Sequence, residues 1–285
     1  MSKQMLLKGM ITLTIGAASM AQAERSRVLL QDGETRIDVI VDTGADGEGD
    51  AIVLLPSSQR GSDDLDAVAE QLAARGMRVL RPQPRGFGAS RGEMRDLTLH
   101  VLAQDVAATI RQLGAGRAIV AGHAYGHYVA RVADLDHPQL VRGVVMLASA
   151  SASADASLPA ALDIAADSAQ PEALRLDALR RAFFATGNDP RPWLEGWQPE
   201  LAALYRKAAK VPARSSWWPV SHAPVLDLQG KDDPWRPRAS ASEVKEVLKE
   251  KATVVVIPHA SHALPVEQPA AVARAIAEWV ASIPR

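Results

Sequence analysis

The chain has 285 residues, of which 47% are hydrophobic and 23% charged, a composition typical of a globular protein rather than a disordered one. Its 32 Lys and Arg residues nearly balance its 33 Asp and Glu residues, which argues against nucleic acid as a partner. The absence of cysteine excludes a disulfide framework and a lipoprotein cysteine, and a chain of this length can bury a sufficient core without either.

The first 23 residues have the pattern of a secretory signal peptide. Lys3 and Lys8 precede a short apolar stretch over residues 10–20, and the small-x-small sequence Ala21-Gln22-Ala23 follows it. The stretch is too short to span a bilayer as a helix, although an uncleaved anchor remains the alternative. The sequence therefore predicts a bacterial protein exported to the periplasm or secreted, with a mature chain 24–285 that is not held in a membrane.

Apolar strands then alternate with amphipathic helices. A hairpin comes first, because two short strands flank Asp32-Gly33. Continuous apolar runs such as Ala51–Leu55 are typical of strands buried on both faces, and their alternation with helices predicts a mostly parallel sheet covered on both sides. The predicted strands are 27–30, 35–41, 51–55, 77–80, 117–121, 141–147, 225–228 and 253–257, and the predicted helices are 65–74, 97–113, a segment after Gly126, 240–249 and 269–283.

The alternation stops between residues 149 and 221, a stretch rich in Ala, Pro and Trp. Helical pieces are predicted over 158–166, 171–185 and 199–210. Because the sheet pattern resumes afterwards, we interpret residues 150–221 as a helical lid inserted after the sixth strand of a single domain. Its tryptophans suit either an apolar ligand or packing of the lid onto the sheet.

Residues 122–126 read Gly-His-Ala-Tyr-Gly and lie between a predicted strand and a predicted helix. In this context the pattern G-x-S-x-G forms a tight turn that presents a nucleophilic serine above the sheet, with glycines where the chain turns sharply. Here the central residue is Ala124, whose methyl group cannot act as a nucleophile. The sequence thus indicates a hydrolase-like turn without the atom that performs the usual chemistry.

Three further motifs occur along the chain. Residues 85–90 read Arg-Gly-Phe-Gly-Ala-Ser, residues 230–234 read Gly-Lys-Asp-Asp-Pro, and residues 258–265 read Pro-His-Ala-Ser-His-Ala-Leu-Pro. With these motifs, the turn at 122–126 and the order of its elements, the mature chain resembles the α/β-hydrolase family over nearly its whole length. The resemblance implies an α/β-hydrolase fold, with a mostly parallel, doubly wound sheet and a helical lid.

The resemblance also implies roles for individual residues. It assigns the acid to Asp233 and the histidine to His262, and it assigns the oxyanion-hole donors to the backbone N–H groups of Tyr125 and Ser58. Pro56-Ser57-Ser58 replaces the family's usual His-Gly after the third strand, and proline has no N–H to donate. Simple turn chemistry at a strand end is the alternative role for the two serines.

The chemistry of Asp233 and His262 agrees with these assignments. Both lie in loops at the carboxyl ends of predicted parallel strands, where sites of such sheets gather. A carboxylate bonded to one ring nitrogen fixes the tautomer of a histidine and raises the basicity of its other nitrogen. We therefore expect this pair to be the working base.

Four further residues, Ser57, His123, Trp235 and His259, are expected in the pocket. His123 and His127 also have the i, i+4 spacing of a metal pair, but the HExxH pattern is missing. Neither a metal nor a cofactor is predicted, and the sequence says nothing about the oligomeric state.

Three explanations of Ala124 remain open: an engineered Ser→Ala exchange, a natural loss of covalent catalysis, or a pocket that only binds. The leading hypothesis is hydrolysis of a small ester, amide or lactone by water that the Asp233–His262 dyad activates. The alternatives are a non-catalytic binding protein for a small molecule, and lyase or cofactor-free oxygenase chemistry by the same dyad.

Overall fold

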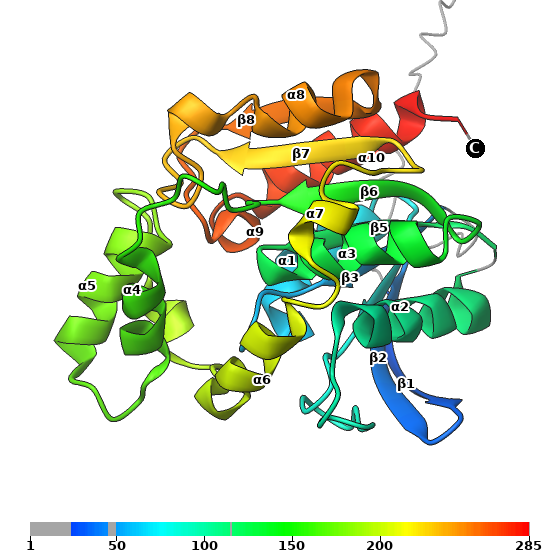
Figure 1. Cartoon of the computed structure of the whole chain (residues 1–285), viewed down its shortest axis with the longest axis horizontal. Helices are drawn as coiled ribbons and strands as arrows, with labels where there is room; N and C mark the ends of the chain where they lie inside the picture. Colours follow the sequence, from blue (N-terminus) through cyan, green and yellow to red (C-terminus); the bar gives the residue numbers. More distant parts are fainter. Residues whose placement is uncertain (1–23, 45–49, 115, 285) are drawn as a thin grey trace, which may run out of the picture.

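A single eight-stranded sheet runs through the protein, with helices on both faces (Figure 1). The computed structural model describes residues 24–44, 50–114 and 116–284, so the predicted signal peptide lies outside the described residues. The strands lie in the order β1-β2-β4-β3-β5-β6-β7-β8. The strands are β1 (Glu24–Asp32), β2 (Thr35–Thr43), β3 (Ala51–Leu55), β4 (Arg78–Pro82), β5 (Ala118–His123), β6 (Val141–Leu147), β7 (Val225–Gly230) and β8 (Ala252–Ile257).

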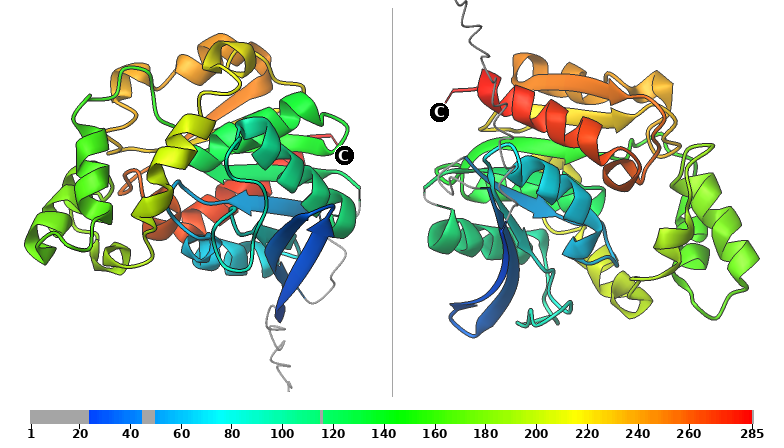
Figure 2. Two further views of the ribbon diagram at one scale, coloured as in Figure 1. Left: turned by 60° about the horizontal axis from the view of Figure 1, so that its bottom comes forward. Right: turned by 180° about the vertical axis from the view of Figure 1, so that it is seen from behind.

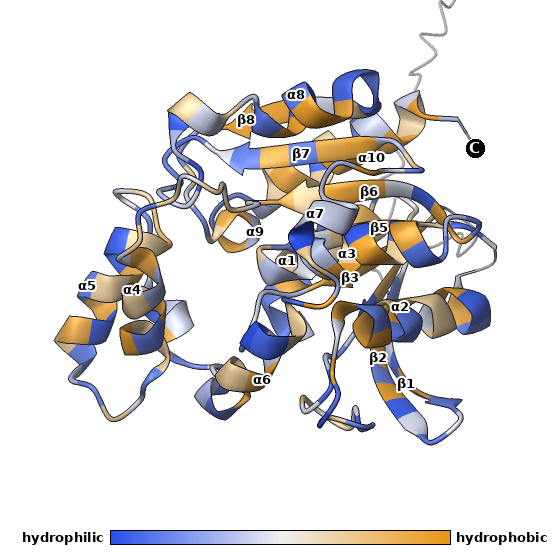
Figure 3. Cartoon of the chain, viewed as in Figure 1, coloured by the Kyte–Doolittle hydropathy of each residue, from blue (hydrophilic) through white to orange (hydrophobic). Residues whose placement is uncertain are grey.

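Six of the strands, β3 to β8, run parallel to their neighbours in this group. The predicted hairpin pairs β1 with β2 antiparallel, and β2 is also antiparallel to β4. Central strands such as β6 are buried along their whole length and drawn largely in the hydrophobic colour (Figure 3). A strand covered on both faces has no solvent-exposed side, which explains the continuous apolar runs in the sequence.

Helices occupy the connections between the strands. The α-helices are α1 (Asp66–Ala73), α2 (Leu99–Leu113), α3 (Tyr125–Asp136), α4 (Leu158–Ala166), α5 (Glu172–Ala182), α6 (Ala202–Ala208), α7 (Arg214–Trp217), α8 (Glu243–Leu248), α9 (Leu264–Glu267) and α10 (Pro269–Ser282). Short 3-10 helices are η1 (Ser62–Leu65), η2 (Arg191–Leu194), η3 (Pro199–Leu201), η4 (Arg238–Ser240) and η5 (Lys249–Lys251). No described helix combines the length and hydrophobicity needed to span a lipid bilayer.

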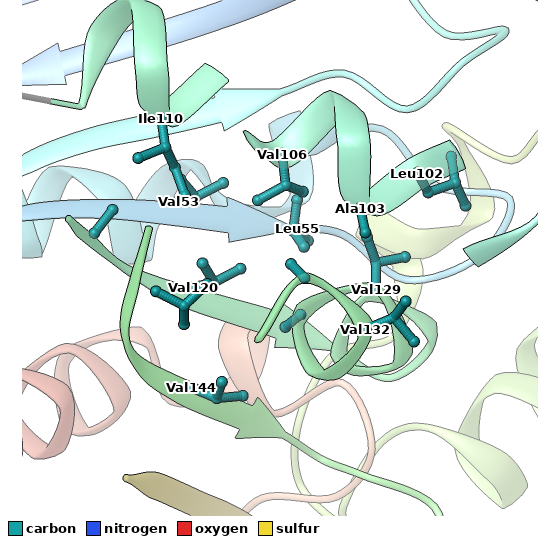
Figure 4. Packing of buried hydrophobic residues seen from close by; sticks show 14 of the residues in the cluster. Val53, Leu55, Leu102, Ala103, Val106, Ile110, Val120, Val129, Val132 and Val144 are labelled. Carbon is teal, nitrogen blue, oxygen red and sulfur yellow. The ribbon is translucent and has the colours of Figure 1, made fainter. Parts of the chain in front are cut away.

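Two hydrophobic clusters hold the helices on the two faces of the sheet. On one face, Val53 and Val120 of the sheet pack beneath Val106 of α2 and Val129 of α3 (Figure 4). On the other face, α1 and α10 cover the strands, as the view from behind shows (Figure 2). Burying each side chain of this size contributes about 1.5–3 kcal/mol to the free energy of folding before conformational entropy is subtracted. These packed layers hold the helices and strands in place, and thereby also the loops at the strand ends.

The chain between β6 and β7 holds α4 to α7, as predicted for the helical insertion after the sixth strand. The insertion has its own hydrophobic cluster, which includes Ala263 of the loop after β8. The buried Arg60 fastens it to the body: its guanidinium pairs with Asp64, donates to the carbonyl of Glu195, and lies 4.7 Å and 4.6 Å from the ring centres of Trp193 and Trp197. Buried cation–π contacts of this kind contribute about 2 kcal/mol.

Two predicted helices end differently in the structure. The helix predicted over 171–185 ends at Ala182, because Phe183 leaves helical geometry and packs its ring near Trp193, Trp235 and His262. The helix predicted over 240–249 is reduced to Glu243–Leu248. In the first case tertiary packing outweighs local helical propensity, and in the second the residues on either side of α8 form the 3-10 helices η4 and η5.

Candidate active site

The turn at 122–126 keeps the strained geometry of a nucleophile elbow although its centre is alanine. β5 ends at His123, α3 begins at Tyr125, and Ala124 between them has φ 46° and ψ −113°. A non-glycine residue held in such a conformation costs about 1–3 kcal/mol, which the surrounding packing must supply. The imidazole of His127 helps, because its Nδ1–H donates to the Ala124 carbonyl.

The two glycines of the turn are required by close backbone approaches. A Cβ atom on Gly122 would lie 2.1 Å from the carbonyl carbon of Gly126. A Cβ atom on Gly126 would lie 2.6 Å from the carbonyl oxygen of Leu55. Only glycine at both positions therefore lets the start of α3 meet the end of β3, where Ser57 and Ser58 follow.

Asp233 and His262, which lie 29 residues apart in the sequence, form a buried dyad. The His262 Nδ1–H donates to Asp233 Oδ2 over 3.0 Å, and the Trp235 N–H donates to Asp233 Oδ1 over 2.8 Å. The Trp235 ring stacks on the imidazole, with ring centres 5.1 Å apart and an angle of 27°. These contacts define the ring orientation and tautomer, and leave Nε2 of His262 as the basic nitrogen.

Glu267 holds the histidine loop against the helical insertion. Its carboxylate accepts from the Ser261 N–H at 2.6 Å, from the Ala185 N–H at 2.7 Å and from the Asn188 side-chain amide at 2.6 Å. Burial raises the pKa of the Glu267 carboxyl above its usual value, and the three donors oppose that shift. A residue next to His262 is thus tied to the insertion through one carboxylate.

A cavity of about 480 Å³ opens beside the dyad and beneath the insertion. It brings together six of the residues predicted for the site: Ser57, Ser58, Ala124, Tyr125, Trp235 and His262. Asp233 lies behind His262 and is almost fully buried. Neither the Tyr125 nor the Ser58 backbone N–H donates to another group among the described residues, so both remain unpaired donors in the cavity wall.

Two of the predicted pocket residues do not line this cavity. His123 is fully buried beneath the site, where its Nε2–H donates to the His262 carbonyl over 2.7 Å. Burial, together with repulsion from His262, lowers the pKa of His123 to about 3, so its ring is neutral. His259 has a left-handed backbone, its side chain is exposed, and its carbonyl accepts from Asn188 and Gln268. The ring of His123 and the backbone carbonyl of His259 thus support the loop, and neither histidine lines the cavity.

The insertion supplies a part of the cavity wall that was not predicted from the sequence. Phe183, Leu162 and Trp217 form apolar surface there, and Lys210 and Arg214 add positive charge. Among these residues, only Trp217 could have been suspected from the sequence, because tryptophans are clustered in the insertion. His127 also lines the cavity, but no three described His, Cys, Asp or Glu side chains are placed to hold a metal ion.

The sequence profile described as the alpha/beta hydrolase family matches residues 52–275, well over half of the chain. The chain belongs to the α/β-hydrolase family. The fold prediction is therefore confirmed. No curated protein sequence matches the chain.

Solved structures of other family members show the same fold. A bacterial membrane phospholipase A superposes with a TM-score of 0.73 and 18% identity, covering 92% of this chain and 87% of that one. An esterase from Thermogutta terrifontis has a TM-score of 0.70 and 24% identity, covering 91% and 99%. An E-2-(acetamidomethylene)succinate hydrolase has a TM-score of 0.72 and 18% identity, covering 90% and 99%.

Within this family fold, the site combines a dyad with a methyl group. His262 can take a proton from a molecule in the cavity while Asp233 stabilises the resulting imidazolium. Ala124 offers no oxygen for an acyl-enzyme bond. The arrangement can therefore perform general base chemistry but cannot form a covalent intermediate at the elbow.

Proposed function

We propose that the protein hydrolyses a small ester, amide or lactone with water activated by the Asp233–His262 dyad. The observation that carries the proposal is the dyad itself: His262 is oriented by Asp233 at 3.0 Å and forms part of the cavity wall together with Ala124. Membership of a family with esterase, lipase and other hydrolase structures supports hydrolysis as the class of reaction.

The steps follow from the tautomer. Nε2 of His262 accepts a proton from a water molecule whose oxygen faces the carbonyl carbon of the bound substrate. The hydroxide adds to the carbonyl carbon, and the N–H groups of Tyr125 and Ser58 donate to the resulting oxyanion. The imidazolium, paired with Asp233, then returns its proton to the leaving oxygen or nitrogen as the carbonyl bond to the leaving group breaks.

The expected rate is modest. Loss of a triad serine costs about 10⁶ in turnover, whereas general base catalysis alone supplies about 10²–10⁴. The proposed substrate is therefore an activated ester or amide, or a strained lactone. The methyl group of Ala124 makes acyl transfer through an enzyme ester impossible at this position.

The test is a panel of activated esters and lactones with the mature protein, His262→Ala and a matched control, His259→Ala. The control removes His259, an exposed histidine of the same loop whose side chain does not line the cavity. Hydrolysis that is lost with His262→Ala and retained with His259→Ala supports the proposal. A parent protein that is inactive on the whole panel overturns it.

A binding protein without catalysis is the second candidate, because Ala124 removes the nucleophile while the cavity remains. Ligand binding by a catalytically inactive parent would favour this role. Proton abstraction from the substrate by the same dyad, as in a lyase or a cofactor-free oxygenase, would be favoured by a product that contains no added water.

We also propose that residues 1–23 direct export and are removed. The small-x-small sequence before Glu24 supports cleavage at that position. Expression of the full chain in a bacterium, followed by fractionation and N-terminal sequencing, is expected to give a protein that starts at Glu24 outside the cytoplasm. A cytoplasmic protein that retains Met1 would refute export.

A further inference from the structure

The charged side chains that line the cavity are all cationic. Arg206 of α6, Lys210 just beyond that helix and Arg214 of α7 come from the helical insertion, and none of the described Asp or Glu residues is in the lining. The chain as a whole carries a formal net charge of -1, so this is a local excess. Like charges gathered in one cavity raise the local concentration of a ligand of opposite charge.

The three cations differ in how well they are neutralised. Arg206 pairs with Asp163 at 2.9 Å, and both side chains are more than half exposed, so water screens the pair. Arg214 is held more firmly, since its guanidinium is 3.2 Å from Glu243 and stacks 3.9 Å from the ring centre of Trp218. Lys210 is also exposed, but it makes no ion pair or side-chain hydrogen bond with any described residue, so its positive charge has no partner there.

Another part of the wall is apolar and suits an apolar body. Leu162, Phe183, Trp217 and Trp235 surround the cavity, and the Trp235 ring is stacked on His262. A ligand that satisfies both parts of the wall has an apolar or aromatic body and one negative charge. Its apolar part would lie among the rings, next to the dyad, and its charge would lie against the insertion.

We propose that the substrate carries a carboxylate on an apolar body and that Lys210, assisted by Arg214, binds this carboxylate. The inference rests on the hydrolysis proposed above and names its substrate class: an ester or lactone with a free carboxylate away from the reacting carbonyl. A monoanion matches the single uncompensated cation, and the flexible ammonium group of a lysine at the cavity rim can reach such a charge without reorganising the wall.

Binding is the first test, because it does not depend on catalysis. The probes are phenylbutyrate and its neutral amide, phenylbutyramide. Each is titrated into the mature protein while the tryptophan fluorescence is recorded, to which Trp217 and Trp235 of the cavity wall contribute. The carboxylate is expected to bind about fivefold more tightly at low salt, and the difference should shrink as salt is added. Equal affinities, or no binding of the carboxylate at millimolar concentrations, overturn the proposal.

Variants of α6 and its C-terminal extension locate the subsite. Lys210→Gln is expected to weaken phenylbutyrate binding about fivefold and leave phenylbutyramide binding unchanged, whereas Lys210→Arg retains the preference. The matched control is Lys207→Gln, which removes the same charge from an exposed residue of α6 outside the cavity lining. An equal loss of affinity in the control variant would show that general electrostatics, and not a subsite, attracts the anion.

Turnover separates this proposal from the proposed function. The substrates are mono-p-nitrophenyl glutarate, which carries a carboxylate, and p-nitrophenyl butyrate, which is neutral. If the carboxylate binds through Lys210 but neither ester is hydrolysed in a His262-dependent reaction, the subsite stands and the hydrolase proposal fails. If both esters are hydrolysed with equal kcat/KM and Lys210→Gln changes neither, the hydrolase proposal stands and the subsite fails.

Discussion

Replacing Ala124 with serine tests whether the dyad and the elbow form one catalytic arrangement. Both residues carry a Cβ atom, so the strained backbone at φ 46° is the same before and after the exchange. We expect the free energy of unfolding to change by less than about 0.5 kcal/mol, because the side chain gains only one oxygen and lies next to a cavity with room for it. The substitution thus adds a nucleophile to a turn that already has the shape to present it.

The size of the effect follows from the parts already in place. The serine of a complete triad raises turnover by about 10⁶. General base catalysis by the dyad, without a serine, already supplies about 10²–10⁴ of this factor. The quotient predicts that Ala124→Ser raises turnover of an activated ester by about 10²–10⁴. The gain requires the 3.0 Å bond between His262 and Asp233, since an unoriented imidazole would not take the proton from the serine hydroxyl.

Two measurements detect the new nucleophile: the burst of p-nitrophenol from p-nitrophenyl acetate, and covalent labelling by a fluorophosphonate, read by intact mass. Ala150→Ser is the control, because it adds the same hydroxyl to the cavity wall outside the elbow. If Ala124→Ser folds with an unchanged melting temperature yet shows neither burst nor label, position 124 and His262 are not within catalytic reach. Water activation beside Ala124 would then lose its geometric basis.

Three further predictions concern the parent site. Asp233→Asn should lower the rate of His262-dependent hydrolysis by about 10²–10⁴, because the imidazolium loses its stabilising carboxylate. The control Asp232→Asn changes an exposed neighbour and should leave the initial rate of hydrolysis unchanged. Folding lowers the pKa of His123 from its ordinary value of 6.5 to about 3. Between these two pH values the histidine is protonated in the unfolded chain but not in the folded protein, so the free energy of unfolding falls as the pH falls through this window. His123→Gln should therefore remove about 1.4 kcal/mol per pH unit from the acid slope of the unfolding free energy, measured by urea denaturation at several pH values; an unchanged slope would contradict a neutral buried ring. Glu267→Gln should destabilise the protein by about 2 kcal/mol in thermal melts, because an amide cannot accept all three hydrogen bonds, and a variant as stable as the parent would show that this link is unimportant.

The architecture and the elements that carry the site were predictable from local sequence patterns. Strand runs such as Ala51–Leu55 and the helix α2 follow from short-range periodicity, which a sequence expresses directly. The turn at 122–126 and the order of Asp233 before His262 also indicated which loops meet at the carboxyl ends of the strands, because parallel strands bring those ends to one edge.

The positions of several side chains could not be predicted without the tertiary structure. His123 belongs to the turn at 122–126 and His259 to the loop that carries His262, yet the ring of His123 supports that loop from beneath and the side chain of His259 faces solvent. The charged wall formed by Lys210 and Arg214 depends on how the insertion folds back over the sheet. Side-chain direction and burial arise from contacts between segments far apart in the chain, and local patterns do not contain those contacts.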